Sequence, residues 1–255
     1  MEDNFFIERL FMPLKLDNPV SEADYVNIQP CIDSLFALAR IANMSIYVKD
    51  YYRGDFLYVS YNPLFLCGYE RDEVKKLGND FYLKVVVPED LEMLSEVIKK
   101  GFEYYYGKLP EIKDNFFISC DFRVRHLNKQ VIMLNHKLTP FAFTSTGEIW
   151  LALCLVTLST RKKPGNIYIQ QLNSSERFDY SFVSKRWKSA QSIKLTEREK
   201  EVLRLSAQGY TIKEIADKLY VEVTTVKYHK TTLCSKLGVD NATEAVYFAS
   251  ANHLI

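Results

Sequence analysis

The residues best suited to bind an external partner share one side of a helix that the sequence predicts from about Val223. They are short hydroxyl side chains, a phenol and a lysine: Thr224, Lys227, Tyr228, Thr231 and Ser235. The opposite side is apolar, with Val226, Leu233 and Leu237 at spacings of seven and four residues. Small hydroxyl groups can approach base edges in a DNA major groove, and lysine reaches guanine or phosphate. Because an ordinary solvated face would more often contain Glu or Asp, this acid-free face favours a helix that lies in a major groove.

The ends of the neighbouring helices can be read from the sequence. A Thr or Asn followed three residues later by Glu is the capping-box pattern, in which both side chains bond free backbone amides of the first turn. The pattern occurs at Thr196–Glu199, Thr211–Glu214 and Asn241–Glu244. Gly209 and Gly238 follow apolar-periodic runs, where glycine readily adopts the left-handed conformation that ends a helix. We therefore predict an all-α domain of four helices over residues 195–255.

Four stretches of this segment follow a known pattern at the right spacing: LTEREKEVLRL, GYTIKEIADKL, TTVKYHKTTLCSKLGV and NATEAV. With them the segment resembles the DNA-binding helix-turn-helix domain of the LuxR type, also called the GerE type. The resemblance implies that the third helix enters the major groove and that Lys227, Tyr228 and Thr231 face the bases. It further implies contacts with the phosphate backbone from Thr225, Lys213 and Lys230. The last helix, from Thr243 to His253, would form a dimer contact.

Glu222 departs from that pattern, because a cap-forming Ser is common at its position. Glu caps poorly, so either the helix begins slightly late, at Thr224, or Glu222 only contributes favourable charge near the positive end of the helix. A carboxylate at this position would also face phosphates and lower the intrinsic affinity for DNA.

Composition and charge indicate a globular protein of one medium and one small domain. The chain has 255 residues, 47% of them apolar, and a formal net charge of +1. Residues 1–160 hold 17 basic and 22 acidic side chains, residues 161–194 hold 8 and 2, and residues 195–255 hold 8 and 8. The positive charge therefore lies in the segment that leads into the four helices, as in a connector near phosphates or in a solvated basic linker.

The cysteines and the apolar runs favour a cytoplasmic protein with no membrane segment. The five cysteines, at positions 31, 67, 120, 154 and 234, form no C-x-x-C pair. The first sixteen residues lack the basic start and apolar core of a signal peptide, and no apolar run approaches the length of a membrane helix. We therefore expect reduced thiols.

Residues 1–160 alternate helical and extended patterns. Helices are expected at Phe5 to Leu10 and at Cys31 to Ala42 after Pro30. Strands are expected at 44–48 and 56–61, followed by short helices at 62–68 and 70–77, a longer helix from Pro88 to about Tyr106, and strands at 116–125, 131–141 and 149–158. In the strand 116–125, Ser119 and Asp121 fall on the side expected to face water. The strand 149–158 is apolar on both sides, so its outer side must be covered by the helix from Cys31 or by a second copy of the protein.

Residues 44–160 resemble a PAS domain in this order of elements and in three stretches: 61–65 (YNPLF), Gly68-Tyr69 with Glu73, and 88–90 (PED), with Val87 where many members have His. The resemblance implies an antiparallel sheet with flanking helices and a cavity that holds a small molecule, or a domain that only dimerises. The residues around Cys67 do not form a flavin-binding motif, and no His lies between Ile46 and Gly107 to bind haem, so we predict no cofactor.

Inward-facing side chains of the predicted sheet are ordinary core residues or the lining of such a cavity: Ile118, Cys120, Phe122, Leu134 and Trp150. His126 and His136 fit a turn and a strand better than a metal site, because no further ligand recurs at metal spacing.

Residues 161–194 form a basic segment whose start is marked by Pro164-Gly165. Ile167 to Leu172 and Phe178 to Val183 predict a β-hairpin, which either connects the two domains or extends the sheet of the first. The fold class predicted overall is α+β: a PAS-like domain at 1–160, this connector, and the four-helix domain at 195–255.

The functional prediction is a sequence-specific transcriptional regulator that binds double-stranded DNA as a homodimer, under the control of a PAS-like sensory or dimerisation domain with a possible small-molecule effector. The sequence contains no phosphate-binding glycine loop and no nucleophile-elbow, zinc-protease or phospho-receiver pattern, so an enzyme is not expected. An alternative is that the C-terminal helices bind a protein such as RNA polymerase.

Overall fold

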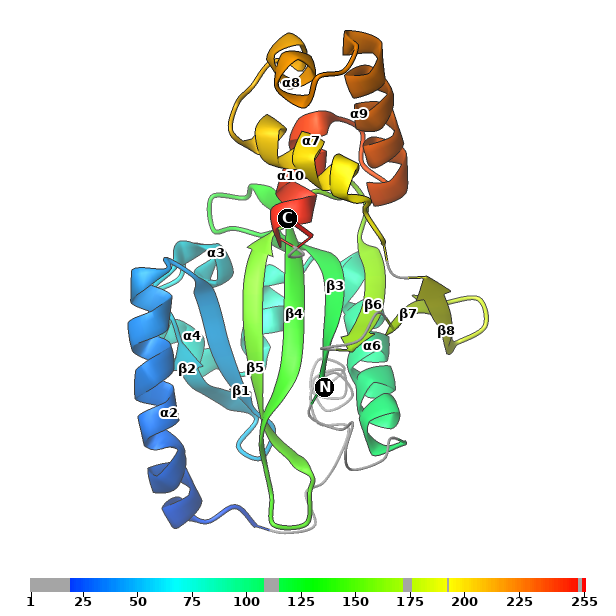
Figure 1. The fold of residues 1–255 in the computed structure, drawn as a ribbon. Helices are drawn as coiled ribbons and strands as arrows, with labels where there is room; N and C mark the ends of the chain where they lie inside the picture. The colour runs from blue at the N-terminus through cyan, green and yellow to red at the C-terminus, as the bar shows by residue number, and fades with distance from the viewer. Residues whose placement is uncertain (1–18, 108–114, 172–175, 192, 252–253) are drawn as a thin grey trace. The chain divides into compact units, whose positions relative to one another are not determined.

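The chain divides into two units between Ala190 and Gln191 in the computed structural model (Figure 1). The structure describes residues 19–107, 115–171, 176–191, 193–251 and 254–255. The predicted helix at Phe5 to Leu10 lies outside the described residues. None of the helices in the described part of the chain is both long and apolar enough to cross a membrane.

The N-terminal unit is built on one eight-stranded sheet with the order β2-β1-β5-β4-β3-β6-β7-β8. The strands are β1 (Ser45–Asp50), β2 (Asp55–Val59), β3 (Phe116–Arg125), β4 (Val131–Phe143), β5 (Ile149–Leu158), β6 (Gly165–Gln171), β7 (Glu176–Ser181) and β8 (Arg186–Gln191). Neighbouring strands from β2 to β7 pair antiparallel. The five strands predicted before residue 160 are confirmed, and the unit extends beyond that residue because β6 pairs with β3 and continues the sheet. The basic segment therefore extends the sheet, which was the second of the two alternatives.

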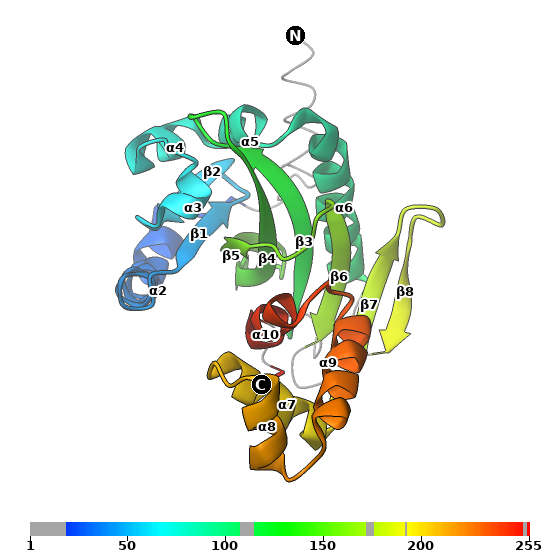
Figure 2. The same ribbon diagram turned by 90° about the horizontal axis from the view of Figure 1, so that it is seen from above.

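Four helices follow one another around one side of the strands (Figure 2): α3 (Pro63–Leu66), α4 (Arg71–Leu77), α5 (Asp80–Val85) and α6 (Pro88–Tyr106). Asn62 caps α3 by accepting a bond from the Leu64 amide, and Pro63 supplies a first residue that needs no amide partner. Helix α5 was not predicted. The main core lies between these helices and the sheet and is rich in aromatic side chains.

Helix α2 (Glu22–Ile41) begins nine residues before the predicted start, so that prediction is corrected. Pro30 was interpreted as a helix start, but it lies inside the helix, which begins with a capping box of Ser21 and Asp24. The buried side of α2 packs its residues Tyr25, Ile32 and Ala39 against β1 and β5. The outer apolar side of β5 is therefore covered by this helix, which is the first of the two alternatives predicted, the other being a second copy of the protein.

Ser119 and Asp121 on β3 are buried, contrary to the expectation that they face water. Asp121 accepts hydrogen bonds from Asn135 Nδ2 and Asn166 Nδ2, both at 2.8 Å. Burial raises the pKa of its carboxyl group, and the two amides oppose this. The alternation of the strand is as predicted, but β6 makes β3 an interior strand whose outer side carries a hydrogen-bonded polar cluster.

The C-terminal unit consists of α7 (Glu197–Ala207), α8 (Ile212–Leu219), α9 (Val223–Leu237) and α10 (Ala242–Ala251). Both threonine capping boxes are formed, and the amide of Glu244 bonds Asn241 Oδ1 at 2.9 Å at the start of α10. Gly238 ends α9 with φ 62°. One small core joins the four helices through the apolar sides that the sequence indicated.

Candidate functional site

Helix α9 begins at Val223 and so includes Thr224 in its first turn. Glu222 occupies the N-cap position and makes no side-chain capping bond. Of the two alternatives for this residue, the structure therefore has the one in which the helix does not start late. The carboxylate lies just before the first turn, where its negative charge interacts favourably with the positive end of the helix dipole.

The predicted DNA-facing side of α9 is exposed. Thr224, Lys227, Thr231 and Ser235 are all exposed, and Tyr228 is 68% exposed. Thr225 and Lys230 are partly buried at the edges of this side, and Lys213 is exposed at the start of α8. The Thr231 hydroxyl donates to the Lys227 carbonyl at 3.1 Å, which leaves its oxygen able to accept a bond from a ligand.

The opposite side of α9 is fixed to the rest of the unit. Val226, Leu233 and Leu237 lie in the core. Near the end of the helix, Lys236 Nζ lies 2.6 Å from Oε1 of the buried Glu199 on α7. Glu199 also accepts the Thr196 amide at 2.8 Å. Burial raises the pKa of Glu199, but the bonds from Lys236 and Thr196 outweigh burial and lower it.

The ion pair between Glu199 and Lys236 was not predicted from the sequence. The sequence identified Glu199 only as the second residue of a capping box. Nothing in the sequence indicates that its other carboxylate oxygen pairs with Lys236. Arg198 was also missed: its guanidinium donates to the Leu219 carbonyl at 2.7 Å and holds the end of α8 against α7. These two contacts tie α7 to the end of α9 and to the end of α8.

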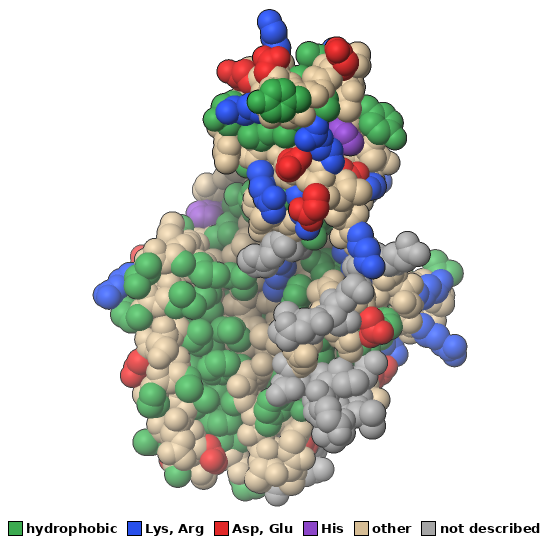
Figure 3. Space-filling view, viewed as in Figure 1, with side chains coloured by type: hydrophobic (Ala, Val, Ile, Leu, Met, Phe, Trp, Pro, Cys, Tyr) green, Lys and Arg blue, Asp and Glu red, His purple; other side chains and the backbone are tan. Residues whose placement is uncertain are grey.

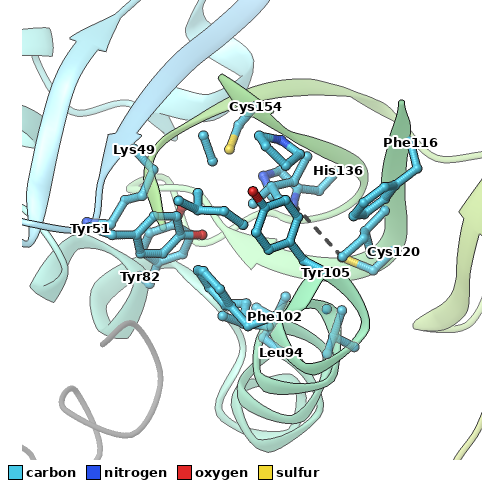
Figure 4. A pocket seen from close by; sticks show the side chains of 18 of the residues that line it. Lys49, Tyr51, Tyr82, Leu94, Phe102, Tyr105, Phe116, Cys120, His136 and Cys154 are labelled. Atoms are coloured by element: carbon cyan, nitrogen blue, oxygen red, sulfur yellow. Dashed lines mark hydrogen bonds between the residues drawn. The ribbon is translucent and has the colours of Figure 1, made fainter. Parts of the chain in front are cut away.

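A second candidate site is a cavity of about 50 Å³ between the sheet and α6 (Figure 4). Ile118, Cys120 and Phe122 on β3 line this cavity, in agreement with the second of the two roles predicted for them. Leu134 is buried in the same core but does not line the cavity. Trp150 does not line it either and packs on the other side of the sheet.

Trp150 was misplaced because the alternation of β5 is broken. The β4–β5 register shifts on both sides of Ala142. Trp150 is left as an extra residue between two paired positions, so Trp150 and Leu151 both face α2, and Ile149 and Ala152 face the cavity. The Trp150 ring meets Tyr25 edge to face at 4.9 Å. A strict two-residue period cannot reveal such a bulge.

The polar groups at the cavity are uncharged or turned away from it. His136 on β4 lines the wall, and its Nε2 lies 2.6 Å from the hydroxyl of Tyr47, which is itself hydrogen-bonded to the hydroxyl of Tyr82. Burial lowers the pKa of His136 to about 4, so the imidazole is neutral near pH 7. The Cys120 thiol lies 4.0 Å from Nδ1 of the same ring.

Lys49 is the one lining residue with a cationic side chain in the described wall. Burial lowers the pKa of its amine to about 7, and nearby carboxylates oppose this. The amine donates to the Asp55 carbonyl at 2.9 Å and to the Asn79 side chain, and it points away from Cys154 and His136 in Figure 4. No carboxylate belongs to the described wall, and no group of three or more possible metal ligands occurs among the described residues. The cavity therefore suits a small neutral molecule better than an ion.

The family whose sequence model matches the chain covers most of the C-terminal unit. The family model "Bacterial regulatory proteins, luxR family" matches residues 194–249. Over 61 residues the chain is 48% identical to the transcriptional regulatory protein LiaR of Bacillus subtilis and to the oxygen regulatory protein NreC of Staphylococcus aureus. The matched part is 24% of this chain and 29% and 28% of those two proteins. The chain thus spans less than a third of the length of these relatives.

Solved structures resemble larger parts of the chain at low identity. The VqmA dimer of Vibrio cholerae is 17% identical, with a TM-score of 0.34, over 87% of this chain and 86% of that chain. A PAS domain from Colwellia psychrerythraea is 18% identical, with a TM-score of 0.37, over 52% of this chain and 97% of that chain. The matched family model, together with the capped helices and the core of α7 to α10, identifies the C-terminal unit as a LuxR-type (GerE-type) helix-turn-helix DNA-binding domain, which follows an N-terminal unit with the antiparallel sheet and flanking helices expected of a PAS-like domain.

Proposed function

We propose that the chain is a sequence-specific transcriptional regulator that binds double-stranded DNA as a homodimer in the cytoplasm. The observation that carries the proposal is the exposed, acid-free side of α9, which is held from behind by the core and by the pair between Glu199 and Lys236. A rigid helix with short polar side chains can enter a major groove and present them to base edges.

Within this proposal, Lys227, Tyr228 and Thr231 face the bases. Thr224 joins them at the first turn of α9. Three residues at the margins contact phosphate and position the helix without reading sequence: Thr225, Lys230 and Lys213. The two copies of α9 in a dimer would contact half-sites about one DNA turn apart.

The N-terminal unit would modulate this binding through its cavity. A small neutral molecule with one hydrogen-bonding group could meet the apolar wall and the neutral ring of His136. A coupling free energy of about 1 to 3 kcal/mol between this cavity and DNA binding corresponds to a 5- to 150-fold response. That range is sufficient for a genetic switch.

The test uses the full chain. Duplexes selected from a random library by the wild-type protein should share a motif and shift in a gel, and Lys227→Ala and Tyr228→Ala should each weaken the specific shift. Lys200→Ala is the matched control, because it removes one positive charge from α7, where Lys200 pairs with Glu197 at 2.7 Å. If no motif emerges, or if all three variants behave alike, DNA recognition by α9 is wrong and the protein-binding alternative gains support. Native mass spectrometry of freshly purified protein would then report both a bound small molecule and the oligomeric state.

A further inference from the structure

We propose that the outer side of α2 is the surface through which two copies of the chain pair, with their α2 helices antiparallel. This inference rests on the homodimer of the proposed function and names its interface. In Figure 3, hydrophobic side chains spread over the part of the N-terminal unit where α2, β1 and β5 lie in Figure 1. The helix accounts for several of the most exposed apolar side chains in the described chain.

The side of α2 that faces away from the sheet carries no charge. Its residues recur every three or four positions: Ala23, Val26, Asn27, Pro30, Ser34, Ala37 and Ile41. Val26 is 71% exposed and Ile41 is 83% exposed, and Leu38 at the margin is 51% exposed. The charged residues of the helix fall on its flanks: Glu22, Asp24, Asp33 and Arg40.

Such a helix is apolar on two opposite sides, because its residues Tyr25, Ile32 and Ala39 are already buried against the sheet. Single exposed apolar residues are common on protein surfaces, but α2 has three on or beside its outer side, Val26, Leu38 and Ile41, along a span of about 22 Å at 1.5 Å per residue.

The charges at the two ends of α2 favour a second copy in antiparallel orientation as the occupant. The first turn is acidic, with Glu22 and Asp24, and the last turn is basic, with Arg40. An antiparallel pair places Arg40 beside the acidic turn of the partner subunit, whereas a parallel pair places like charges together. A twofold axis near the middle of the helix maps the outer side of α2 onto itself, which is the self-complementarity that such an interface needs.

Cys31 reports on this geometry. It is exposed near the midpoint of α2, on one flank of the proposed interface. In an antiparallel pair the same flanks face each other, so the two Cys31 thiols lie close to the axis on the same side. The cysteines at 67, 120 and 154 are buried, and Cys234 is partly buried in the other unit.

The experiment combines sedimentation equilibrium with cross-linking of the full chain by a short bis-maleimide. The wild type should be a dimer that cross-links, and Cys31→Ser should remain a dimer that does not.

Ile41→Glu and Val26→Glu should each raise the dissociation constant of the dimer at least tenfold. Val183→Glu is the matched control, because Val183 is 98% exposed outside α2 and should change nothing. Arg40→Glu should weaken the dimer, because only the antiparallel arrangement places Arg40 beside the acidic first turn of the partner subunit.

A wild-type chain that stays monomeric at all concentrations overturns the inference. A dimer that tolerates Ile41→Glu and gives no Cys31 cross-link also overturns it, and that result is the one expected if residues 1–18 of the same chain cover this side. Gel shifts separate this failure from that of the proposed function. Variants of α2 should weaken binding to a duplex with two half-sites and leave binding to a single half-site unchanged, whereas a wild type without any specific shift contradicts the proposed function alone.

Discussion

The hydroxyl of Tyr25 donates a 2.7 Å hydrogen bond to Oδ2 of Asp50, joining α2 to the end of β1. The other oxygen of Asp50 accepts the amides of Tyr52 and Arg53 at 2.8 and 2.9 Å and so shapes the turn between β1 and β2. Tyr51, inside this turn, lines the cavity. The packing of α2 and the wall of the cavity therefore share one turn, and a ligand that shifts Tyr51 would also affect the contact of Asp50 with α2.

Tyr25→Phe should lower the free energy of unfolding by about 1 to 2 kcal/mol, because the buried carboxylate of Asp50 loses one of its partners. The ring itself remains to pack against Trp150. Urea unfolding measures the change, and Tyr52→Phe, whose side chain is partly exposed, should stay within about 0.5 kcal/mol of the wild type. Equal stability of Tyr25→Phe and the wild type would show that this bond contributes nothing to the attachment of α2.

Gly101→Ala should close the cavity without unfolding the protein. A Cβ atom at this position of α6 would lie 2.3 Å from Cδ1 of Ile118, so the Ile118 side chain must move, and both residues line the cavity. Alanine favours a helix by up to about 1 kcal/mol over glycine, which offsets the crowding. Native mass spectrometry should show loss of a co-purified small molecule in Gly101→Ala and its retention in Lys99→Ala, on an exposed position of the same helix. Retention in both variants would mean that the ligand binds elsewhere.

The neutral His136 should make the N-terminal unit less stable in mild acid. Burial lowers the pKa of the folded imidazole from 6.5 to about 4, so between these values the unfolded chain takes up a proton that the folded chain does not. Stability is therefore complete above about pH 6.5 and falls as the pH decreases towards 4, by a total on the order of 3 kcal/mol. His136→Gln should remove this dependence from urea midpoints measured at pH 4 to 7, and His126→Gln, in the turn after β3, should keep it. A wild type with flat midpoints would contradict the neutral imidazole.

Elements with local signals were predictable from the sequence, and features that depend on distant segments were not. The capping boxes at Thr196 and Thr211 and the alternation of β3 are written within a few residues. The start of α2 was missed because a proline is a stronger signal for a helix start than the Ser21–Asp24 capping box, although this helix accommodates Pro30 in its interior.

The cavity shows the same division. Ile118, Cys120 and Phe122 follow from the period of one strand, but Trp150 lies beyond a bulge that only the pairing of β4 with β5 creates. Tyr47 and Tyr82 come from a strand and a helix far apart in the sequence, and only the fold brings their hydroxyls together with the ring of His136.

Glu199→Gln should destabilise the C-terminal unit by about 1 to 3 kcal/mol, because it removes the charge that pairs with Lys236 and weakens the bond to the Thr196 amide. The pKa of Glu199 is lowered in the folded state, so its contribution is present above the ordinary value of 4.5 and is lost as the pH falls through the folded value. Differential scanning calorimetry should show a larger difference between wild type and variant at pH 7 than at pH 3. Glu201→Gln, which disrupts an exposed pair with Arg198, should change stability by less than about 1 kcal/mol.

Lys227→Ala distinguishes reading of a base from contact with phosphate. If the amine bonds guanine, its loss should cost about 1 to 3 kcal/mol of binding free energy and relax specificity at one base position, because the hydrogen bond is available only with that base. If the amine contacts phosphate, affinity should fall for every sequence and the slope of log K against log salt should decrease by about one unit, since one fewer counterion is released. Fluorescence anisotropy with a panel of single-base variants at several salt concentrations separates the two outcomes.

Lys200→Ala controls for the loss of one charge on α7 and should leave both the base preference and the slope close to those of the wild type. A Lys227→Ala protein that is indistinguishable from Lys200→Ala in both measurements would remove Lys227 from the DNA-binding surface.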